Sequence, residues 1–233
     1  MSDWEQEHIA SAFAFELGKV GDQGVRRRMV GNLVHVDPGL AAEVARRVGE
    51  PEPEAATASE GNDTAGPRTS PALSLEHQRG SGVRTRKVAV LAAPGVDGEQ
   101  VRDAHEQLGA RGAVVETLAA YGGDVLAGDG ARLPVDRPLP TVASVLYDAL
   151  VVPDSGDRAL CSDPDAVRFL AEAWRHGKPV ALLGSGADLS RAAGLDVPDA
   201  TAGVAVCRAD EAAGPAFWED FAGLVEQHRF PQR

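Results

Sequence analysis

Large apolar residues recur about every four positions through the first fifty residues. They are Ile9, Phe13 and Leu17, then Val25, Met29 and Leu33, then Leu40, Val44 and Val48. This spacing gathers them on one face of an α-helix. Asp37 before Pro38 suits a helix start, and Gly49 suits a helix end. We therefore expect three short helices within residues 4–49, which bury too little apolar surface to be independent and should pack on further structure.

The next segment has no such periodicity. Residues 50–84 are rich in Glu, Pro, Ala, Ser, Thr and Gly and contain almost no large apolar residues. A segment of this composition cannot bury enough apolar surface to order itself. We expect a flexible linker here.

From residue 86 onward, short apolar runs alternate with helical patterns. The predicted strands are KVAVL, AVVETLA, DALVVP, KPVALL and, at an edge, GVAVC; the predicted helices span 98–109, 163–176, 187–193 and 216–228. Asp163 before Pro164 is a strong helix start. Between two strands, Asp129-Gly130 within residues 122–136 indicates a β-hairpin. Alternation of this kind predicts an α/β fold whose parallel sheet is covered by helices on both faces.

Composition narrows the classes of function. The net charge is −12, which disfavours nucleic acid as a partner, and the one basic cluster, Arg26 to Arg28, is expected to be a solvated or salt-bridged helix face. No run approaches the ~18 to 20 apolar residues of a membrane helix, and MSDWEQEHIA is too polar for a signal peptide, so we expect a cytoplasmic protein without membrane contact. Two cysteines and six scattered histidines suggest neither a disulfide framework nor a metal site.

Two blocks of sequence resemble one family. WEQEHIASAFAFELGKV and VRRRMVGNLVHVDPGLAAEVARRVG resemble the end of the catalytic core in large-subunit haem catalases. KVAVLAAPGVDGEQV, GGDVLAGDGARLPVD, SVLYDALVVP and AVRFLAEAWRHGKPVALLGSG resemble the extra C-terminal domain of the same enzymes. That domain is similar to class I glutamine amidotransferases and PfpI-type proteins and implies a flavodoxin-like sheet. The implied domains are residues 1–49, the linker 50–84 and residues 85–233.

The resemblance also implies what the chain lacks. Complete members of the family are haem-dependent tetramers that convert hydrogen peroxide to water and oxygen, and their haem ligands lie upstream of the segment that this chain matches. Tyr121 and Tyr147 have no surrounding haem-ligand motif, so we expect no cofactor in this chain. The implied partners are further copies of the chain, or a catalase core that the N-terminal helices contact.

PfpI-type enzymes carry a catalytic cysteine on the sharp turn, the elbow, that follows the strand corresponding to KPVALL. Here Gly184 stands at the cysteine position, with Ser185 and Gly186 after it, and the acid position falls near Asp97. We therefore expect a vestigial elbow and a vestigial acid that caps a helix. Cys161 and Cys207 lie outside the elbow and are expected to be structural or incidental.

These observations favour a non-catalytic piece of a large-subunit catalase with a structural, assembly or chaperone-like role. One alternative is a PfpI-type hydrolase or deglycase that works without the elbow cysteine, through Ser185 or Cys161. The other is a flavin- or nucleotide-binding module. GSG at 184–186 argues weakly for it, because the GxGxxG pattern fails at Leu189.

Overall fold

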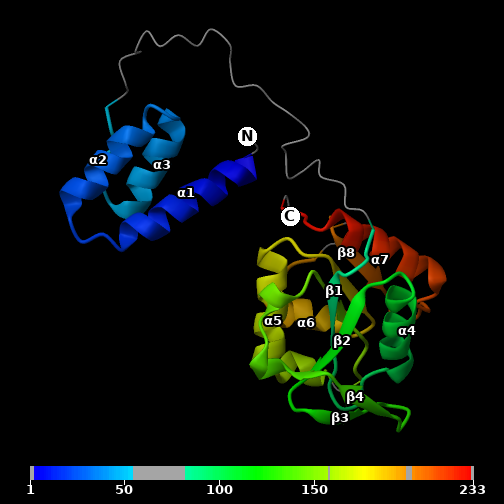
Figure 1. The fold of residues 1–233 in the computed structure, drawn as a ribbon. Coiled ribbons are helices and arrows are strands. Elements are labelled where there is room, and N and C mark those ends of the chain that lie inside the picture. Colours follow the sequence, from blue (N-terminus) through cyan, green and yellow to red (C-terminus); the bar gives the residue numbers. More distant parts are fainter. Residues whose placement is uncertain (1–2, 55–81, 157, 198–200, 232–233) are drawn as a thin grey trace. The chain divides into compact units, whose positions relative to one another are not determined.

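The chain forms two compact units, Met1–Thr69 and Ser70–Arg233. The computed structural model describes residues 3–54, 82–156, 158–197 and 201–231 (Figure 1). Most of the predicted linker, residues 55–81, lies outside the described residues, so the linker and the domain limits at 49 and 85 stay predictions. No helix in the described ranges is long and apolar enough to cross a membrane.

The first unit consists of the three predicted helices. They are α1 (Asp3–Gly18), α2 (Gln23–Leu33) and α3 (Pro38–Val48), and α3 contacts both of the others. Asp37 begins α3 by accepting the Leu40 N–H at 2.8 Å, and Gly49 ends it at φ +72°. Both helix signals in the sequence are therefore confirmed. Ala41 and Val44, which have no exposed surface, lie at the centre of this small core.

In the basic cluster of α2, Arg26 and Arg27 are salt-bridged and Arg28 is exposed, as expected of a solvated or salt-bridged face. Arg26 Nε and Arg27 Nε each lie 2.9 Å from a different carboxylate oxygen of Glu50, and Arg26 also donates to the Val20 carbonyl oxygen at 2.7 Å. The Glu50 side chain has no exposed surface. These contacts join Glu50, which lies two residues after α3, to α2. The two guanidinium groups thereby hold the residues that follow α3 against α2.

The second unit is built on a six-stranded sheet in which every pair of neighbouring strands is parallel, as the alternation predicts. The order is β5-β2-β1-β6-β7-β8. The bounds are β1 Lys87–Leu91, β2 Val114–Ala119, β5 Arg137–Pro138, β6 Ala149–Val152, β7 Val180–Leu183 and β8 Val204–Cys207. The sequence gives no signal for β5, a two-residue edge strand that contains a proline.

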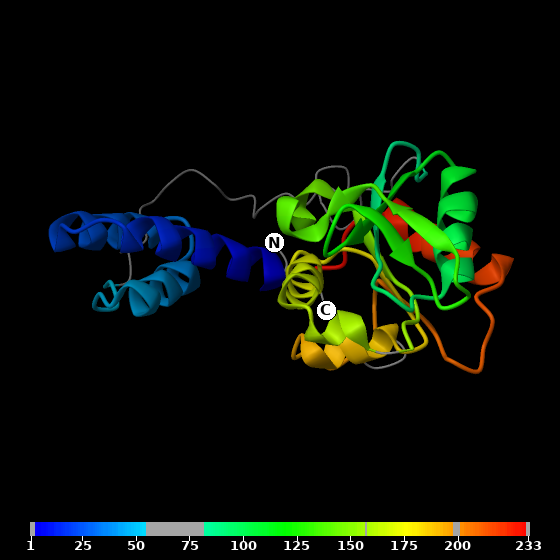
Figure 2. The same cartoon turned by 90° about the horizontal axis from the view of Figure 1, so that it is seen from below.

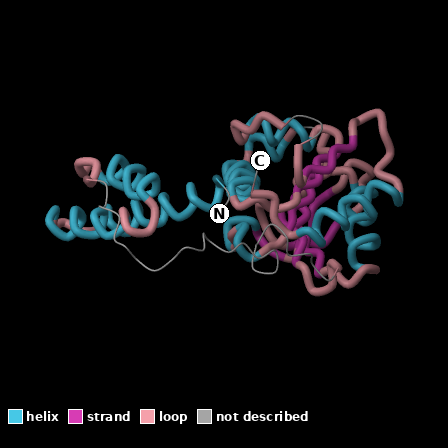
Figure 3. Tube along the Cα trace, turned by 90° about the horizontal axis from the view of Figure 1, so that it is seen from above, coloured by secondary structure: helices cyan, strands magenta, loops and turns pink. Residues whose placement is uncertain are grey.

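Helices cover both faces of this sheet (Figures 2 and 3). One face carries α4 (Gly98–Gly109) and α7 (Pro215–Gln227), and the other carries α5 (Pro164–Arg175) and α6 (Gly186–Ala192). Alternate residues of β1 point to opposite faces of the sheet. Val88 and Val90 belong to the core under α4 and α7. Ala89 and Leu91 belong to the core under α5. The predicted doubly covered α/β sheet is confirmed.

The predicted hairpin lies beside the carboxyl ends of the strands. It comprises β3 (Gly123–Leu126) and β4 (Arg132–Val135), with Gly130 at φ +84° in the turn. Two backbone bonds fasten it to the loop after β1: Gly95 N–H donates to the Leu126 carbonyl at 2.9 Å, and Gly128 N–H donates to the Val96 carbonyl at 2.9 Å. The remaining short helices are 3₁₀ turns: η2 Leu139–Thr141, η3 Ser144–Leu146 and η4 Ala159–Ser162.

The residues after α7 fold back onto the opposite end of the sheet. Phe230 N–H donates to the Gly177 carbonyl at 2.7 Å, and its ring fills the space that a side chain at Gly203 would need. His228, at φ +72°, places its Nε2 3.2 Å from Asp148 Oδ1. This segment therefore contacts the residues that precede β6, β7 and β8.

Candidate functional site

The elbow forms where the sequence places it. β7 ends at Leu183, Gly184 turns the chain at φ +52°, and α6 begins at Gly186. A Cβ atom built on Gly184 would lie only 2.5 Å from Asp154 Oδ2, and its three nearest neighbours are all atoms of the Asp154 side chain. A side chain at position 184 and the carboxylate of Asp154 therefore compete for one space.

Ser185, the hydroxyl of the elbow, is held by its neighbours. Its Oγ lies 2.5 Å from Asp154 Oδ1 and 2.9 Å from the Ser155 carbonyl oxygen, and it accepts the Ser155 N–H at 2.9 Å. Its backbone N–H also donates to Asp154 Oδ1, at 3.1 Å. The Ser185 hydroxyl therefore binds the loop after β6 through both its proton and one of its two lone pairs.

Asp97 caps α4, as the sequence predicts. Its Oδ1 accepts the Glu99 N–H at 2.9 Å and the Gln100 N–H at 3.1 Å. Its own N–H donates to the Asp154 carbonyl at 2.8 Å. The structure therefore joins Asp97 to the elbow through the backbone of Asp154.

Sequence reasoning missed Asp154 altogether. The signal was present, because Asp154 follows the buried strand β6 by two residues, and β6 is the neighbour of the elbow strand β7. Loops at the carboxyl ends of parallel strands meet at one edge of the sheet. What the sequence could not show is that Gly184 leaves room for the side chain of a residue thirty positions earlier.

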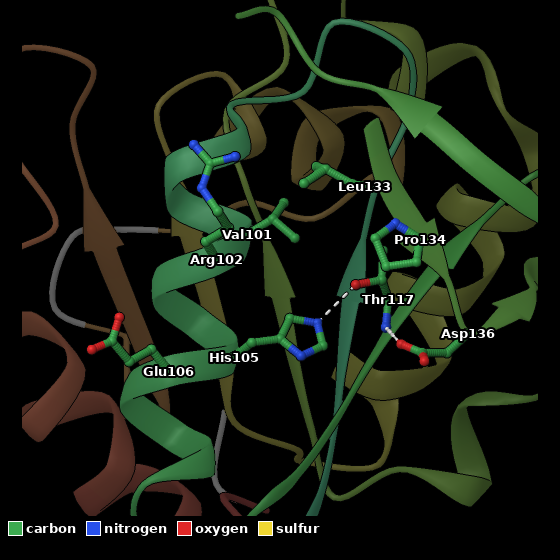
Figure 4. A pocket seen from close by; sticks show the side chains of 8 residues that line it. All are labelled: Val101, Arg102, His105, Glu106, Thr117, Leu133, Pro134 and Asp136. Carbon is green, nitrogen blue, oxygen red and sulfur yellow. Dashed lines mark hydrogen bonds between the residues drawn. The ribbon is translucent and has the colours of Figure 1, made fainter. Parts of the chain in front are cut away.

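A second site lies between α4, β2 and the hairpin (Figure 4). It is a cavity of about 580 Å³. Its lining residues are Val101, Arg102, His105, Glu106, Thr117, Leu133, Pro134 and Asp136. His105 Nε2 lies 2.8 Å from Thr117 Oγ1, and Asp136 Oδ2 accepts the Thr117 N–H at 2.7 Å. A chain of polar contacts therefore runs from α4 through β2 to the residue after β4.

The electrostatics of this cavity favour a neutral imidazole. Half-burial lowers the pKa of His105 below its ordinary value, and nearby Asp136 only partly opposes the shift. Thr117, which His105 contacts, is 2 % exposed. Arg102 pairs with Asp129 at 3.2 Å, and Glu106 points away from the imidazole ring (Figure 4). The cavity therefore offers hydrogen-bonding groups, a neutral imidazole among them, to a small molecule.

Of the two cysteines, Cys207 adjoins the elbow, because its carbonyl oxygen accepts the Gly184 N–H at 2.8 Å, while its thiol lies against the carbonyl oxygens of Arg208 and Glu211. Cys161 is half-buried in η4 and Cys207 is buried at the end of β8; burial is the main cause that raises the pKa of each thiol. Tyr147 is 2 % exposed and donates its hydroxyl to Glu116 Oε2 at 2.6 Å, whereas Tyr121 is 83 % exposed. Within the described ranges, no cluster of three or more His, Cys, Asp or Glu side chains is arranged to hold a metal ion.

Comparisons with known proteins match both units to catalases. A family model described as the C-terminal domain found in long catalases matches residues 84–233, and one described as catalase-related immune-responsive matches residues 1–48. Catalase HPII of Mycobacterium avium is 44% identical over 100% of this chain and 34% of its own length. Catalase HPII of Pseudomonas aeruginosa is 38% identical over 79% of this chain and 26% of its own length. Catalase-2 of Bacillus subtilis is 35% identical over 98% of this chain and 32% of its own length. The chain spans between about a quarter and about a third of the length of these relatives.

Proposed function

Because the chain belongs to the long catalases and corresponds to their C-terminal part, we propose that it contributes structure and assembly, and no second active site, to an enzyme that removes hydrogen peroxide. The observation that carries this proposal is the elbow. The position at which a PfpI-type enzyme needs its cysteine holds Gly184, and the Asp154 carboxylate fills the space that a side chain would take. We accordingly interpret Gly184, Ser185, Gly186 and Asp97 as vestigial.

Haem is the cofactor of the family, and the tyrosines of this chain do not fit it. A tyrosine ligates haem iron through its ionised oxygen. Burial and the hydrogen bond to Glu116 raise the pKa of Tyr147, so its hydroxyl is held in the neutral form. Tyr121 is 83 % exposed in the turn before β3, where no enclosed apolar site surrounds it. We therefore propose no step of peroxide chemistry within these residues.

The helical unit supports a role in assembly. Several of its large apolar side chains are exposed: Phe15 (66 %), Val25 (38 %), Met29 (39 %) and Val36 (72 %). Surfaces of this kind in a small helical unit are suited to burial against another protein surface. We propose that they contact a catalase core or a second copy of the chain, in the cytoplasm, and that any chaperone-like activity would use the same surface.

The first test measures peroxide chemistry directly. The purified chain, alone and with added haemin, is mixed with hydrogen peroxide while the loss of peroxide absorbance is followed. We expect no rate above that of buffer or of haemin alone, and no shift of the haemin Soret band, because neither tyrosine can ligate iron. Dismutation above the haemin control would contradict the non-catalytic proposal.

A second test addresses the structural role in a relative. A variant of Mycobacterium avium Catalase HPII that lacks the part aligned with residues 84–233 should consume peroxide at first but lose activity sooner on heating. Equal heat resistance of the shortened and intact enzymes would count against a stabilising role. The outcome does not depend on whether the isolated chain binds haemin.

The enzyme alternative requires Ser185 or Cys161 to act as the nucleophile. The structure favours it less, since Ser185 Oγ is held between Asp154 and the backbone of Ser155, and burial raises the pKa of the Cys161 thiol. An esterase or glyoxalase rate that falls on Ser185→Ala or Cys161→Ala would establish this alternative. A flavin or nucleotide module would be supported by a rise in melting temperature with FMN or a nucleotide.

A further inference from the structure

We propose that the carboxylate of Asp154 fills the elbow and fixes the loop after β6 there, so that the backbone of the same residue binds the loop after β1. We call these contacts, which join the loops after β1, β6 and β7, the clasp. This proposal rests on the proposed structural role and deepens it. It names the group that fills the elbow, the position at which the family resemblance would place a catalytic residue. Two sets of contacts and the space at Gly184 carry it.

The first set is made by the side chain of Asp154. Its Oδ1 lies 3.1 Å from the Ser185 amide nitrogen and 2.5 Å from the Ser185 hydroxyl oxygen. Charge-assisted bonds to a carboxylate are shorter and about twice as strong as neutral ones. The loop after β6 is thereby fastened to the first residues after β7.

The second set is made by the backbone of the same residue. Asp154 N–H donates to Gln100 Oε1 at 2.7 Å, and the Asp154 carbonyl accepts the Asp97 N–H at 2.8 Å. A β-bridge between Val96 and Ser155 lies beside them. These bonds fasten the loop after β6 to the loop after β1 and to the start of α4.

The third observation is the space at the elbow. A Cβ at Gly184 would meet Asp154 Oδ2 at 2.5 Å, Cγ at 2.6 Å and Cβ at 2.9 Å. Real Cβ atoms do not approach other heavy atoms so closely. Glycine at position 184 is therefore the condition for the carboxylate to lie where it does.

The clasp lies at the point of the fold where a ligand would be expected. In open α/β sheets, ligands bind outside the carboxyl ends of the strands, where the strand order reverses. The order β2-β1-β6-β7 puts that point between β1 and β6. The loops after these two strands are bonded to each other through Asp97 and Asp154, so the chain itself occupies the crevice.

The competition for space is tested by a double-mutant cycle in the full chain, with Trp4→Phe in every variant so that Trp174 and Trp218 report unfolding of the α/β unit. Gly184→Ala alone should lower the melting temperature by about 8 °C or more. In the Asp154→Gly background the same change should lower it by about 4 °C, the cost of a left-handed alanine. Equal losses in the two backgrounds would overturn the proposal.

Gly203→Ala is the matched control. Gly203 also has a positive φ, +77°, but a side chain there would meet the ring of Phe230 and not Asp154. Its cost should be the same in both backgrounds to within about 1 °C, as for independent sites. If Gly184→Ala prevents folding, a folded Asp154→Gly/Gly184→Ala protein supports the proposal and an unfolded one overturns it.

Hydrogen exchange tests the clasp separately from the space. Asp154→Gly leaves the backbone carbonyl that accepts the Asp97 N–H in place. If the carboxylate holds the loops together, the amides of both Ser185 and Asp97 should exchange faster in this variant. Unchanged protection of Asp97 would overturn the clasp, whatever the peroxide assay shows about the proposed function.

Discussion

Among single residues, Lys178 is a cation held inside the α/β unit. It is 3 % exposed, and its Nζ donates to the carbonyl oxygen of Ser144. Burial, aided by the nearby charge of Arg229, lowers its pKa to about 8. The hydrogen bond joins the residue before Pro179 and β7 to the 3₁₀ turn η3. The sequence could not indicate this, because a lysine after a helix end is ordinarily exposed.

The lowered pKa predicts an unusual dependence of stability on alkaline pH. Between pH 8 and 10.5 the unfolded chain binds more protons at Lys178 than the folded chain does, so this residue makes the protein more stable as the pH rises. We expect the stability of the wild type relative to Lys178→Met to increase across this range. Urea unfolding at a series of pH values measures the difference.

Lys19→Met is the control for that series. Lys19 lies in the helical unit, where it pairs with Glu16. Its removal should leave the pH profile of the α/β unit unchanged. A Lys178→Met profile parallel to that of the wild type between pH 8 and 10.5 would refute the explanation.

At the scale of the element, local sequence signals proved dependable. Asp37, Asp97 and Asp163 each begin a helix by accepting backbone N–H groups, and Asp129-Gly130 forms the hairpin turn. These signals work because cap and turn bonds join residues two or three positions apart. The strand β5 was missed because two residues, one of them Pro138, carry no periodicity.

The cap of α5 allows a quantitative test. Asp163 Oδ1 accepts the Asp165 N–H at 2.9 Å, and Asp163→Ala should lower the free energy of unfolding by about 1 kcal/mol, the usual value of such a cap. Asp165→Ala is the matched control, because Asp165 binds the exposed Arg168 on the surface, and its cost should be smaller. Urea unfolding of the two variants compares them, and equal losses would show that the cap is not the cause.

The candidate site was only half predictable for a related reason. The positions of Gly184, Ser185 and Asp97 follow from strand and helix patterns, and the structure places them at the carboxyl end of the sheet. Asp154 enters the elbow across a separation of thirty residues, and His105 meets Thr117 across twelve. Such contacts depend on strand order, which local patterns do not determine.

At the scale of the whole molecule, partly buried histidines make the α/β unit sensitive to mildly acidic pH. His105, His176 and His228 all lie in the α/β unit, and partial burial is the first cause that lowers the pKa of each from 6.5. Asp148 partly opposes the shift at His228, while Arg229 and Arg86 add to it. Below pH 6.5 the unfolded chain takes up protons that the folded unit resists, so stability falls.

We therefore expect the α/β unit to lose stability as the pH falls from 6.5 towards 5, before carboxylates contribute. Replacing the three histidines together by glutamine should flatten the profile in this window. Replacing His8 and His35 of the helical unit is the control and should leave the α/β unit unaffected. Thermal unfolding at pH 7, 6 and 5 gives the measurement, and a wild-type profile without slope would contradict the prediction.

The segment after α7 has a consequence for how the protein is made. Phe230 bonds to Gly177 through its backbone N–H and packs its ring against Gly203. These glycines precede β7 and β8, which are synthesised before residue 230. During synthesis, the end of the sheet at which β7 and β8 begin therefore stays uncovered until residue 230 has emerged. Partly made α/β proteins expose apolar surface in this way and are prone to aggregate. Translation speed through the codons for residues 204–230 should therefore influence the yield of folded protein.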